Sequence, residues 1–180
     1  MADSPVIETK RLRIEPFSIK HLTARYVSWL NDPEVVRYSE QRHRRHSLES
    51  CKEYFESFQG TPNYLWAIIQ KECGIHMGNI NAYVDVNNKV ADIGILLGEK
   101  DEWNKGYGLE VWKAVITYLF DSGCIRKISA GTLTSNRGMI NIMVRSGMVE
   151  DGRRVRHYLF DGQEIDALHF ALFRKDVGQS

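Results

Sequence analysis

Hydrophobic positions in the first half of the chain follow a strand period in some segments and a helix period in others. Residues 11–17 (RLRIEPF) alternate, which predicts a strand, and apolar residues recur at helical spacing over 21–30 and 48–58. From residue 64 the period changes to two, so we expect three further strands that pair as an antiparallel meander. These three strands cover residues 64–71, 75–86 and 90–98.

The second half of the chain continues the alternation of helices and strands. Leu109 and Trp112 belong to a helical stripe of apolar residues that follows a glycine-rich turn. A strand is expected over 126–133, and after it a helix that Ser135 can cap and Gly147 can end. This half therefore predicts helices that alternate with strands of the same sheet.

Two long strands over 148–160 and 165–175, joined through the turn DGQ, end the pattern. The expected fold is α/β with a mixed sheet and helices on its faces, in the order β-α-α-β-β-β-α-β-α-β-β. No low-complexity linker, internal repeat or shift in composition divides the chain, so we expect one domain over residues 1–180.

The composition excludes several classes of function. Among 180 residues, 43% are apolar and 26% charged, and the net charge is +1, which lacks the basicity typical of nucleic-acid binding. No run of 18 apolar residues predicts a membrane span. Cys51, Cys73 and Cys124 lack the spacing of metal ligands, and the first residues lack the apolar core of a signal peptide. We therefore expect a cytoplasmic protein without a metal site.

The stretch EWNKGYGLEVW, residues 102–112, suggests a phosphate site. A glycine-rich turn at the start of a helix directs several free N–H groups at one point, with about half a positive charge behind them. Gly106 and Gly108 let the backbone approach a ligand closely, and Lys105 adds a cation. The alternative is a tight turn without a ligand, because neither a dinucleotide fingerprint nor a Walker motif is present.

Three segments resemble the GCN5-related N-acetyltransferase (GNAT) superfamily, and within it the branch of ribosomal-protein alanine acetyltransferases and their sugar- and drug-acetylating relatives. They are IETKRLRIEPF near the N-terminus, ADIGILLGEKDEWNKGYGLEVW in the middle, and NRGMINIMVRSGMVEDGRRVRHYLFDGQEIDALHFAL near the C-terminus. The resemblance implies the GNAT fold, acetyl-coenzyme A (acetyl-CoA) as cosubstrate, and direct acetyl transfer to an amine without a metal or covalent intermediate.

The resemblance also implies the residues that hold acetyl-CoA. Its pantetheine would lie beside Leu96, Leu97 and Gly98, and Asn136 would face it from the start of the last helix. Trp103 stands where the family usually has Gln or Arg, so a side-chain contact to phosphate would be lost there. The residues expected around the pyrophosphate are Trp103, Asn104, Lys105, Gly106, Tyr107 and Gly108.

For catalysis, the resemblance points to a main-chain N–H near Leu96 that polarises the thioester carbonyl, and to Asp92 as a base that acts through water. Asp92 aligns with a glutamate of the family; the alternative is a solvated carboxylate at a strand start. Met143 falls where the family often has a tyrosine that protonates the sulfur. Tyr83 or Tyr158 would have to substitute for it, although strand tyrosines usually serve packing.

The acceptor is expected beside the polar segment SWLNDPEVVRYSEQRHRRHS, residues 28–47. It resembles, less specifically, acetyltransferases that modify nucleotide-linked amino sugars, and its arginines and histidines could pair with a diphosphate. The alternative is an exposed basic loop that aids solubility. The acceptor contacts expected from this segment are Trp29, Asn31, Arg37, Tyr38 and Arg42.

Three hypotheses follow for the function. The first is an N-acetyltransferase for a small-molecule amine, with an amino sugar or its nucleotide conjugate favoured. The second is acetylation of a protein N-terminus, and the third is an acetyl-CoA-binding regulator without catalysis. Exposed strands at the end of the sheet make a homodimer a further expectation.

Overall fold

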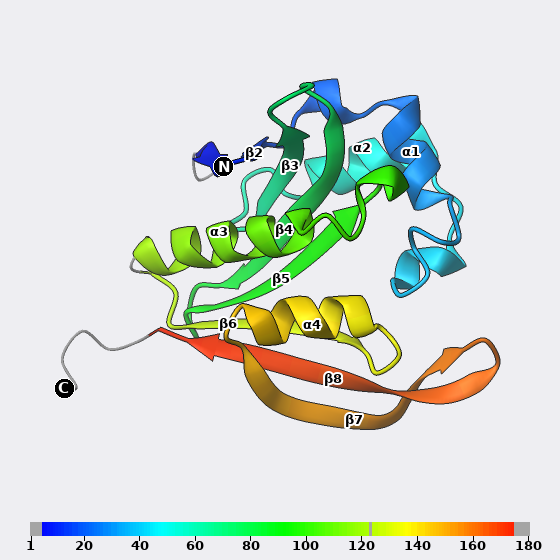
Figure 1. Cartoon of the computed structure of the whole chain (residues 1–180), viewed down its shortest axis with the longest axis vertical. Coiled ribbons are helices and arrows are strands. Elements are labelled where there is room, and N and C mark those ends of the chain that lie inside the picture. Colours follow the sequence, from blue (N-terminus) through cyan, green and yellow to red (C-terminus); the bar gives the residue numbers. More distant parts are fainter. Residues whose placement is uncertain (1–4, 123, 175–180) are drawn as a thin grey trace.

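A computed structural model of the chain describes residues 5–122 and 124–174, so residue 175 of the last predicted strand lies outside the described part. It confirms the α/β fold: eight strands form one mixed sheet in the order β1-β2-β3-β4-β5-β6-β8-β7 (Figure 1). The strands are β1 (Ile7–Glu8), β2 (Leu12–Pro16), β3 (Tyr64–Gln70), β4 (His76–Asp85), β5 (Val90–Leu97), β6 (Lys127–Leu133), β7 (Val149–Phe160) and β8 (Gln163–Phe173).

The element order matches the prediction with one addition, the strand β1, which pairs with β2. Two residues are too few to show a period, which is why the hydrophobic pattern missed it. The predicted antiparallel meander is confirmed as β3, β4 and β5. The helices are α1 (Ala24–Leu30), α2 (Leu48–Glu56), α3 (Tyr107–Asp121) and α4 (Arg137–Arg145).

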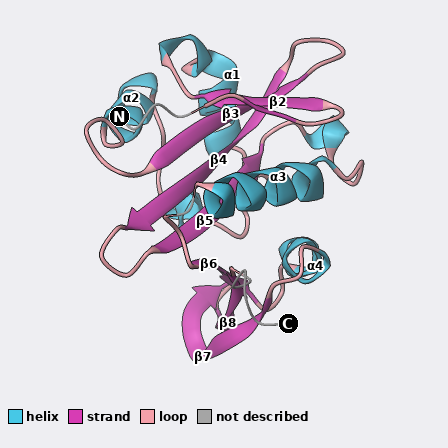
Figure 2. Cartoon of the chain, turned by 90° about the vertical axis from the view of Figure 1, so that its left-hand side faces the viewer, coloured by secondary structure: helices cyan, strands magenta, loops and turns pink. Residues whose placement is uncertain are grey.

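Helices cover both faces of the sheet and bury two separate apolar clusters (Figure 2). On one face α3 packs Trp112 and Val115 against sheet residues such as Trp66 and Ile80. On the other face α1 and α2 bury Trp29 and Cys51, together with apolar side chains of β3. A site between the helices and the sheet can therefore draw side chains from either face.

Local sequence fixes where the helices begin. The side chain of Thr23 accepts a hydrogen bond from the main chain of Tyr26 at the start of α1, and Ser47 caps α2 in the same way. The prediction that Ser135 caps α4 is wrong, because Asn136 is the capping residue and accepts from the main chain of Met139 at 3.1 Å. Asparagine and serine are about equally good caps, so the sequence did not distinguish two neighbours.

The parallel pairing of β5 with β6 is short. It joins only Val90–Asp92 to Lys127–Ser129, after which β6 continues beside β8 while β5 remains paired with β4. Figure 1 shows β5 and β6 running apart beyond this point. The divergence opens the middle of the sheet and defines where a ligand can enter.

Gly98, at the end of β5, is required for packing between the sheet and α1. A methyl group added to its Cα would lie 1.9 Å from Cδ2 of Trp29. The Trp29 ring is 5% exposed and its Nε1 donates to Oε1 of Glu99 at 2.8 Å. The ring is held from two sides and has no room to move away from a new side chain.

We predict that Gly98→Ala lowers the free energy of unfolding by about 1–3 kcal/mol, as overpacking of a core does. Gly138→Ala is the matched control, because Gly138 lies in α4 and an added methyl group would be 3.8 Å from its nearest neighbour. Thermal unfolding of the two variants measures the difference. Equal stability of Gly98→Ala and the wild type would show that Trp29 is not fixed in place.

The start of α3 is held by the turn between β1 and β2. Oε1 of Glu110 accepts from the Thr9 hydroxyl at 2.7 Å and from the Arg11 main chain at 2.9 Å, and Oε2 accepts from Arg11 Nε at 2.7 Å. Arg11 Nη1 donates to the main-chain oxygen of Lys105 at 2.9 Å. These contacts fix the glycine-rich turn from outside the cleft.

We predict that Glu110→Gln costs about 1.5–3 kcal/mol of stability at pH 7, because it removes charge-assisted hydrogen bonds. Burial acts to raise the pKa of Glu110, but hydrogen bonds from Thr9 and Arg11 outweigh it and place the pKa below its ordinary value of 4.5. The native state therefore favours the carboxylate, and its contribution is present at neutral pH and disappears as the pH falls below 4.5.

Denaturant unfolding of the wild type and Glu110→Gln at several pH values tests this, with Glu53→Gln on the exposed side of α2 as control. The two stability curves should converge at low pH. A gap between them that stays constant with pH would contradict a role for the ionised carboxyl.

Candidate active site

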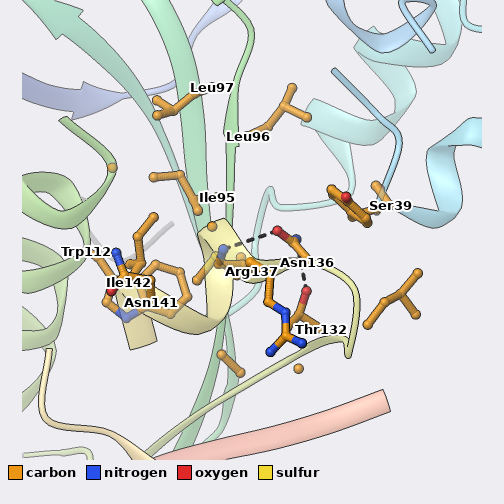
Figure 3. A pocket seen from close by; sticks show the side chains of 18 of the residues that line it. Ser39, Ile95, Leu96, Leu97, Trp112, Thr132, Asn136, Arg137, Asn141 and Ile142 are labelled. Carbon is orange, nitrogen blue, oxygen red and sulfur yellow. Dashed lines mark hydrogen bonds between the residues drawn. The ribbon is translucent and has the colours of Figure 1, made fainter. Parts of the chain in front are cut away.

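The opening between β5 and β6 is a cleft of about 960 Å³ (Figure 3). β5 lines one side with residues 92–97, β6 lines the other with residues 130–133, and the starts of α3 and α4 border one face. The segment 34–40 and residues of the β7–β8 hairpin border the other face. This volume lies within the range typical of small-ligand sites.

The glycine-rich turn enters this cleft with an unusual backbone. Asn104 has φ 61° and Gly106 has φ 82°, both in the left-handed region, and Gly106 is the N-cap residue of α3. Left-handed residues beside a helix start turn successive N–H groups toward one point, which makes a concave anion site. The Lys105 side chain, in contrast, pairs with Glu102 at 3.1 Å and does not line the cleft.

Gly108 and Tyr107 have packing roles that the sequence did not show. A methyl group on Gly108 would lie 3.0 Å from Cδ1 of Ile142 and 3.4 Å from Cδ1 of Leu97, so this glycine brings α3 close to α4. The Tyr107 hydroxyl accepts from Gln70 Nε2 at 3.0 Å. Only the main chain of these two residues is available to a ligand at the turn.

The main-chain N–H and C=O groups of successive β5 residues point alternately to the two sides of the strand. Gly98 N–H donates to the Met77 oxygen at 2.9 Å, and the register with β4 is regular from Val90 to Leu97. In an antiparallel ladder this places the groups of Leu96 toward β4 and those of Leu97 toward the opening. The Leu97 oxygen accordingly accepts from Trp103 Nε1 at 2.9 Å, not from β4.

The N–H expected near Leu96 is therefore that of the next residue, Leu97. The prediction placed the donor one residue too early, because the sequence alone does not show which residues of a strand direct their main-chain groups toward the neighbouring strand. Figure 3 shows the corresponding alternation of the side chains, with Leu97 directed toward the α3 and α4 side and Leu96 toward Ser39.

The start of α4 adds polar groups to the part of the cleft that the glycine-rich turn borders. Asn136 lines it, but its amide is engaged locally: Oδ1 accepts from Met139 N and Nδ2 donates to the Thr132 hydroxyl at 3.0 Å. Arg137 and Arg145 line the cleft as well, and the sequence analysis did not single them out. An arginine on an exposed helix face carries no signal in sequence that separates binding from solubility.

Asp92 lies where β5 and β6 separate. Its Oδ2 accepts from the Ser129 hydroxyl at 2.8 Å across the last parallel pair. The Asp92 side chain is accessible to solvent, but it lines the cleft and is surrounded by protein. The resulting desolvation raises its pKa above the ordinary 3.8, although the hydrogen bond from Ser129 and the charge of His169 act to lower it. A carboxyl with a raised pKa is a better proton acceptor than an ordinary aspartate.

Tyr83 pairs with Asp92 across β4 and β5 but does not line the cleft. Its ring stacks on Phe58 at 5.5 Å and its hydroxyl lies 3.4 Å from that of Tyr54. The predicted catalytic role of Tyr83 is therefore not supported, because its hydroxyl is engaged on the α2 side. Tyr158, the other tyrosine considered, does line the cleft.

Of the five expected acceptor contacts, only Tyr38 lines the cleft. Trp29 is buried against Gly98, and Asn31 closes its own loop through hydrogen bonds with the main chain of His46 at 2.9 Å. For these two residues the prediction is wrong, because tertiary contacts occupy the polar atoms that it assigned to a ligand.

Arg37 and Arg42 join the segment 37–42 to the tip of the β7–β8 hairpin. Tyr38 stacks on Phe160 at 5.6 Å, with the Arg37 guanidinium over both rings. Arg42 pairs with Glu40 at 2.8 Å and donates to the Leu159 oxygen at 3.3 Å. The two arginines thus help to close one end of the cleft and do not project into it.

The basic residues after this segment lie apart from the main cleft. Arg42, Arg44, Arg45 and His46 border a separate hollow of about 450 Å³ with Leu30 and its neighbours. They do not line the cleft that holds Asp92. A diphosphate bound to these side chains would therefore not lie in the main cleft.

Ser129 and His169 were missed by sequence reasoning, although His169 lines the cleft and Ser129 bonds to Asp92. Single serines and histidines in strands are common, and only the strand order brings these two residues near Asp92. Residues 34–35 and 39–40 of the cleft wall belong to the segment 28–47 that was expected to border the acceptor.

The part of the cleft between the starts of α3 and α4 fits a ligand that carries phosphate groups. Around Gly106 an added methyl group would meet only Arg11 Nη2, at 3.6 Å, so the turn is open to a ligand. Arg137 and Arg145 supply cations, and the buried Nε1 of Trp112 has no hydrogen-bond partner among the described residues. These donors match a ligand with anionic and carbonyl oxygens.

Within residues 5–122 and 124–174, none of the helices combines the length and the apolar character that a membrane crossing requires. The same residues contain no group of three or more His, Cys, Asp or Glu side chains that could hold a metal ion.

Comparisons with known proteins identify the family. Residues 11–149 match the family described as Acetyltransferase (GNAT) domain. A Bacillus licheniformis protein named uncharacterized N-acetyltransferase p20 is 25% identical over 181 residues, covering 93% of this chain and 96% of that protein.

Solved structures show the same fold. RimL, a ribosomal L7/L12 alpha-N-protein acetyltransferase in complex with coenzyme A, gives a TM-score of 0.84 at 15% identity, covering 94% of this chain and 98% of that one. A spermidine N-acetyltransferase from Vibrio cholerae, in complex with CoA and spermine, gives 0.82 at 14% identity, covering 92% and 97%. Because the family match spans most of the sequence, the chain belongs to the GNAT family and is an acetyl-CoA-dependent N-acetyltransferase.

Proposed function

We propose that the protein transfers the acetyl group of acetyl-CoA to the primary amine of a small molecule, with amino sugars and their nucleotide conjugates as the favoured class. The observation that carries the proposal is the open main chain of Leu97 beside the concave turn at Gly106. One cleft thereby offers a donor for a thioester carbonyl and a site for a diphosphate.

The β5 strand supplies the electrostatic part of catalysis. The Leu97 N–H donates to the thioester oxygen and stabilises the negative charge that develops as the amine attacks. The loss of one such donor typically costs about 10² to 10³ in rate. The thiolate leaves readily, since a thiol has a pKa near about 8.5, and strong acid assistance to the sulfur is not required.

The acceptor amine must be neutral to attack. An amine with a pKa of about 10.4 is neutral once in about 2,500 molecules at pH 7, whereas an α-amine near about 7.7–8.0 loses only about 1 kcal/mol. Asp92 supplies a negative charge in the cleft that favours removal of the amine proton through an intervening group. The strength of base that the site needs therefore depends on the acceptor.

The closed end of the cleft supports a small acceptor. Segment 37–42 and the hairpin tip contact each other through Tyr38, Phe160 and Arg42, at the end of the hairpin away from the level of Asp92. Tyr38, Ser39 and Tyr158 line this end and offer hydroxyl groups and aromatic faces. Such a lining suits a compact molecule that bears hydroxyl groups.

A second candidate is the N-terminal amine of a protein. Its support is the likeness in fold to RimL, which is a ribosomal L7/L12 alpha-N-protein acetyltransferase. An α-amine needs less help from a base, which suits an aspartate that does not contact it directly.

A panel of amines tests these candidates. Purified protein with acetyl-CoA should release free thiol with amino sugars or their nucleotide conjugates, and far more slowly with peptides that present a free N-terminus. Faster release with the peptides would favour the second candidate. If calorimetry showed that acetyl-CoA binds but no amine caused release of its thiol, the protein would be a regulator that binds the cosubstrate without catalysis.

We predict that Gly108→Ala weakens acetyl-CoA binding at least tenfold, because the new methyl group enters the contact between the main chain and the ligand. The same group also meets Cδ1 of Ile142, which could disturb packing. The double variant Gly108→Ala with Ile142→Val removes that contact, since valine lacks Cδ1, and should restore stability without restoring binding.

Isothermal titration calorimetry with acetyl-CoA and thermal unfolding measure the two effects, with Ile142→Val alone as control. Wild-type affinity in the double variant would remove Gly108 from the cofactor site.

A further inference from the structure

Asp92 is too far along β5 to contact an amine that attacks a thioester held at Leu97. The two residues lie five positions apart on one strand. At about 3.3 Å per residue this separates them by about 16 Å along the strand. A second group between them is needed to pass the proton.

His169 on β8 lies further than Asp92 toward the Leu97 end of the cleft, measured along the strands. It pairs with Gly131, which lies two residues beyond Ser129, the partner of Asp92. Residues two apart on a strand face the same side, so Asp92, Ser129, Gly131 and His169 all point to one face of the sheet. This places the imidazole further into the opening than the carboxyl of Asp92, on the side of Leu97.

Gly131 lets the imidazole extend across β6. A methyl group on Gly131 would lie 3.2 Å from both Cε1 and Nδ1 of His169, so any larger residue would displace the ring. The ring therefore lies over β6, toward the cleft that it lines together with Asp92. His169 and Asp92 also interact electrostatically.

The surroundings leave the imidazole available for proton transfer. No hydrogen bond to either ring nitrogen is found within residues 5–122 and 124–174. The β7 residue opposite His169 is Gly152, which carries no side chain. The charged side chains that line the same cleft are those of Asp92, Glu34, Glu40, Glu102, Arg137 and Arg145. Histidine is the side chain suited to exchange protons near neutral pH, and the other described histidines do not line this cleft.

We propose that His169 is the catalytic group that takes the proton of the acceptor amine, with Asp92 holding the resulting imidazolium by charge. The amine nitrogen bonds to the acetyl carbon, the carbon–sulfur bond breaks, and the thiolate leaves with the bonding electrons. The proton released by the nitrogen passes to His169 and from there to the thiolate or to solvent. This inference rests on the proposed function.

The test is the pH dependence of kcat/KM for an amine that the wild type acetylates. Protonation of the amine alone gives a slope of about one in log rate against pH, and a base that must also be neutral raises the slope to about two at low pH. We expect this steepening in the wild type. In His169→Gln the rate should fall about 10²-fold and the slope should stay near one.

Two further variants separate catalysis from structure. His169→Gly should regain activity on addition of imidazole, because the space over Gly131 remains. His157→Gln, on the exposed hairpin strand, should keep the wild-type rate and profile. Calorimetry should show unchanged acetyl-CoA binding in His169→Gln.

The possible failures are distinct. A wild type that acetylates no amine sinks the proposed function, and this inference with it. An active wild type with an equally active His169→Gln overturns the inference alone. A His169→Gln that loses activity equally at every pH, with no rescue of His169→Gly by imidazole, assigns the residue a structural role and overturns it too.

Discussion

The separation of β5 from β6 after three parallel pairs is the constraint on which the site depends. A strand in the middle of a sheet normally has both edges paired, and unpaired main-chain groups away from water are costly. Here β6 stays paired with β8 along its whole length and separates from β5, so the main-chain groups of Leu97 face the opening. The Trp103 indole satisfies the carbonyl, and the N–H is the group to which our proposal assigns the thioester oxygen. The same divergence leaves Asp92 and Ser129 at the vertex of the cleft.

Close approach at glycines links the packing of the fold to the chemistry of the site. Gly98 makes room for Trp29, Gly108 for Ile142 and Gly131 for His169. The contacts at Gly108 and Gly131 position α4 and β8, which border the cleft, and the contact at Gly98 holds α1 against the end of β5. Outside the cleft, the contacts of Glu110 with Thr9 and Arg11 fix the start of α3, so the turn at Gly106 is preorganised without a side chain that would compete with a ligand. Preorganised donors of this kind lower the cost of binding and of charge development.

The fold could be predicted from the sequence to the extent that local periodicity determined it. Long strands and capped helices were found, whereas β1, with two residues, shows no period. The glycine-rich turn could be located before α3, because its glycines interrupt the hydrophobic pattern just ahead of a helical stripe; that it holds a cofactor stays a prediction. The acceptor residues could not, because their roles depend on distant partners: Trp29 faces Gly98, and Arg42 reaches Leu159. His169 was missed for the same reason, since only the order of β5, β6 and β8 brings it near Asp92.

The central claim is that the edge of β5 and the turn before α3 together hold the acyl carrier through main-chain N–H groups. Amide chemical shifts of the protein labelled with ¹⁵N, recorded while coenzyme A is added, test it at single residues. The account predicts large, saturable shifts for the amides of Leu97, Gly106 and Gly108, and a smaller change for Leu96, whose groups face β4. Unchanged shifts at Leu97 and at both glycines, with saturable changes elsewhere, would contradict it.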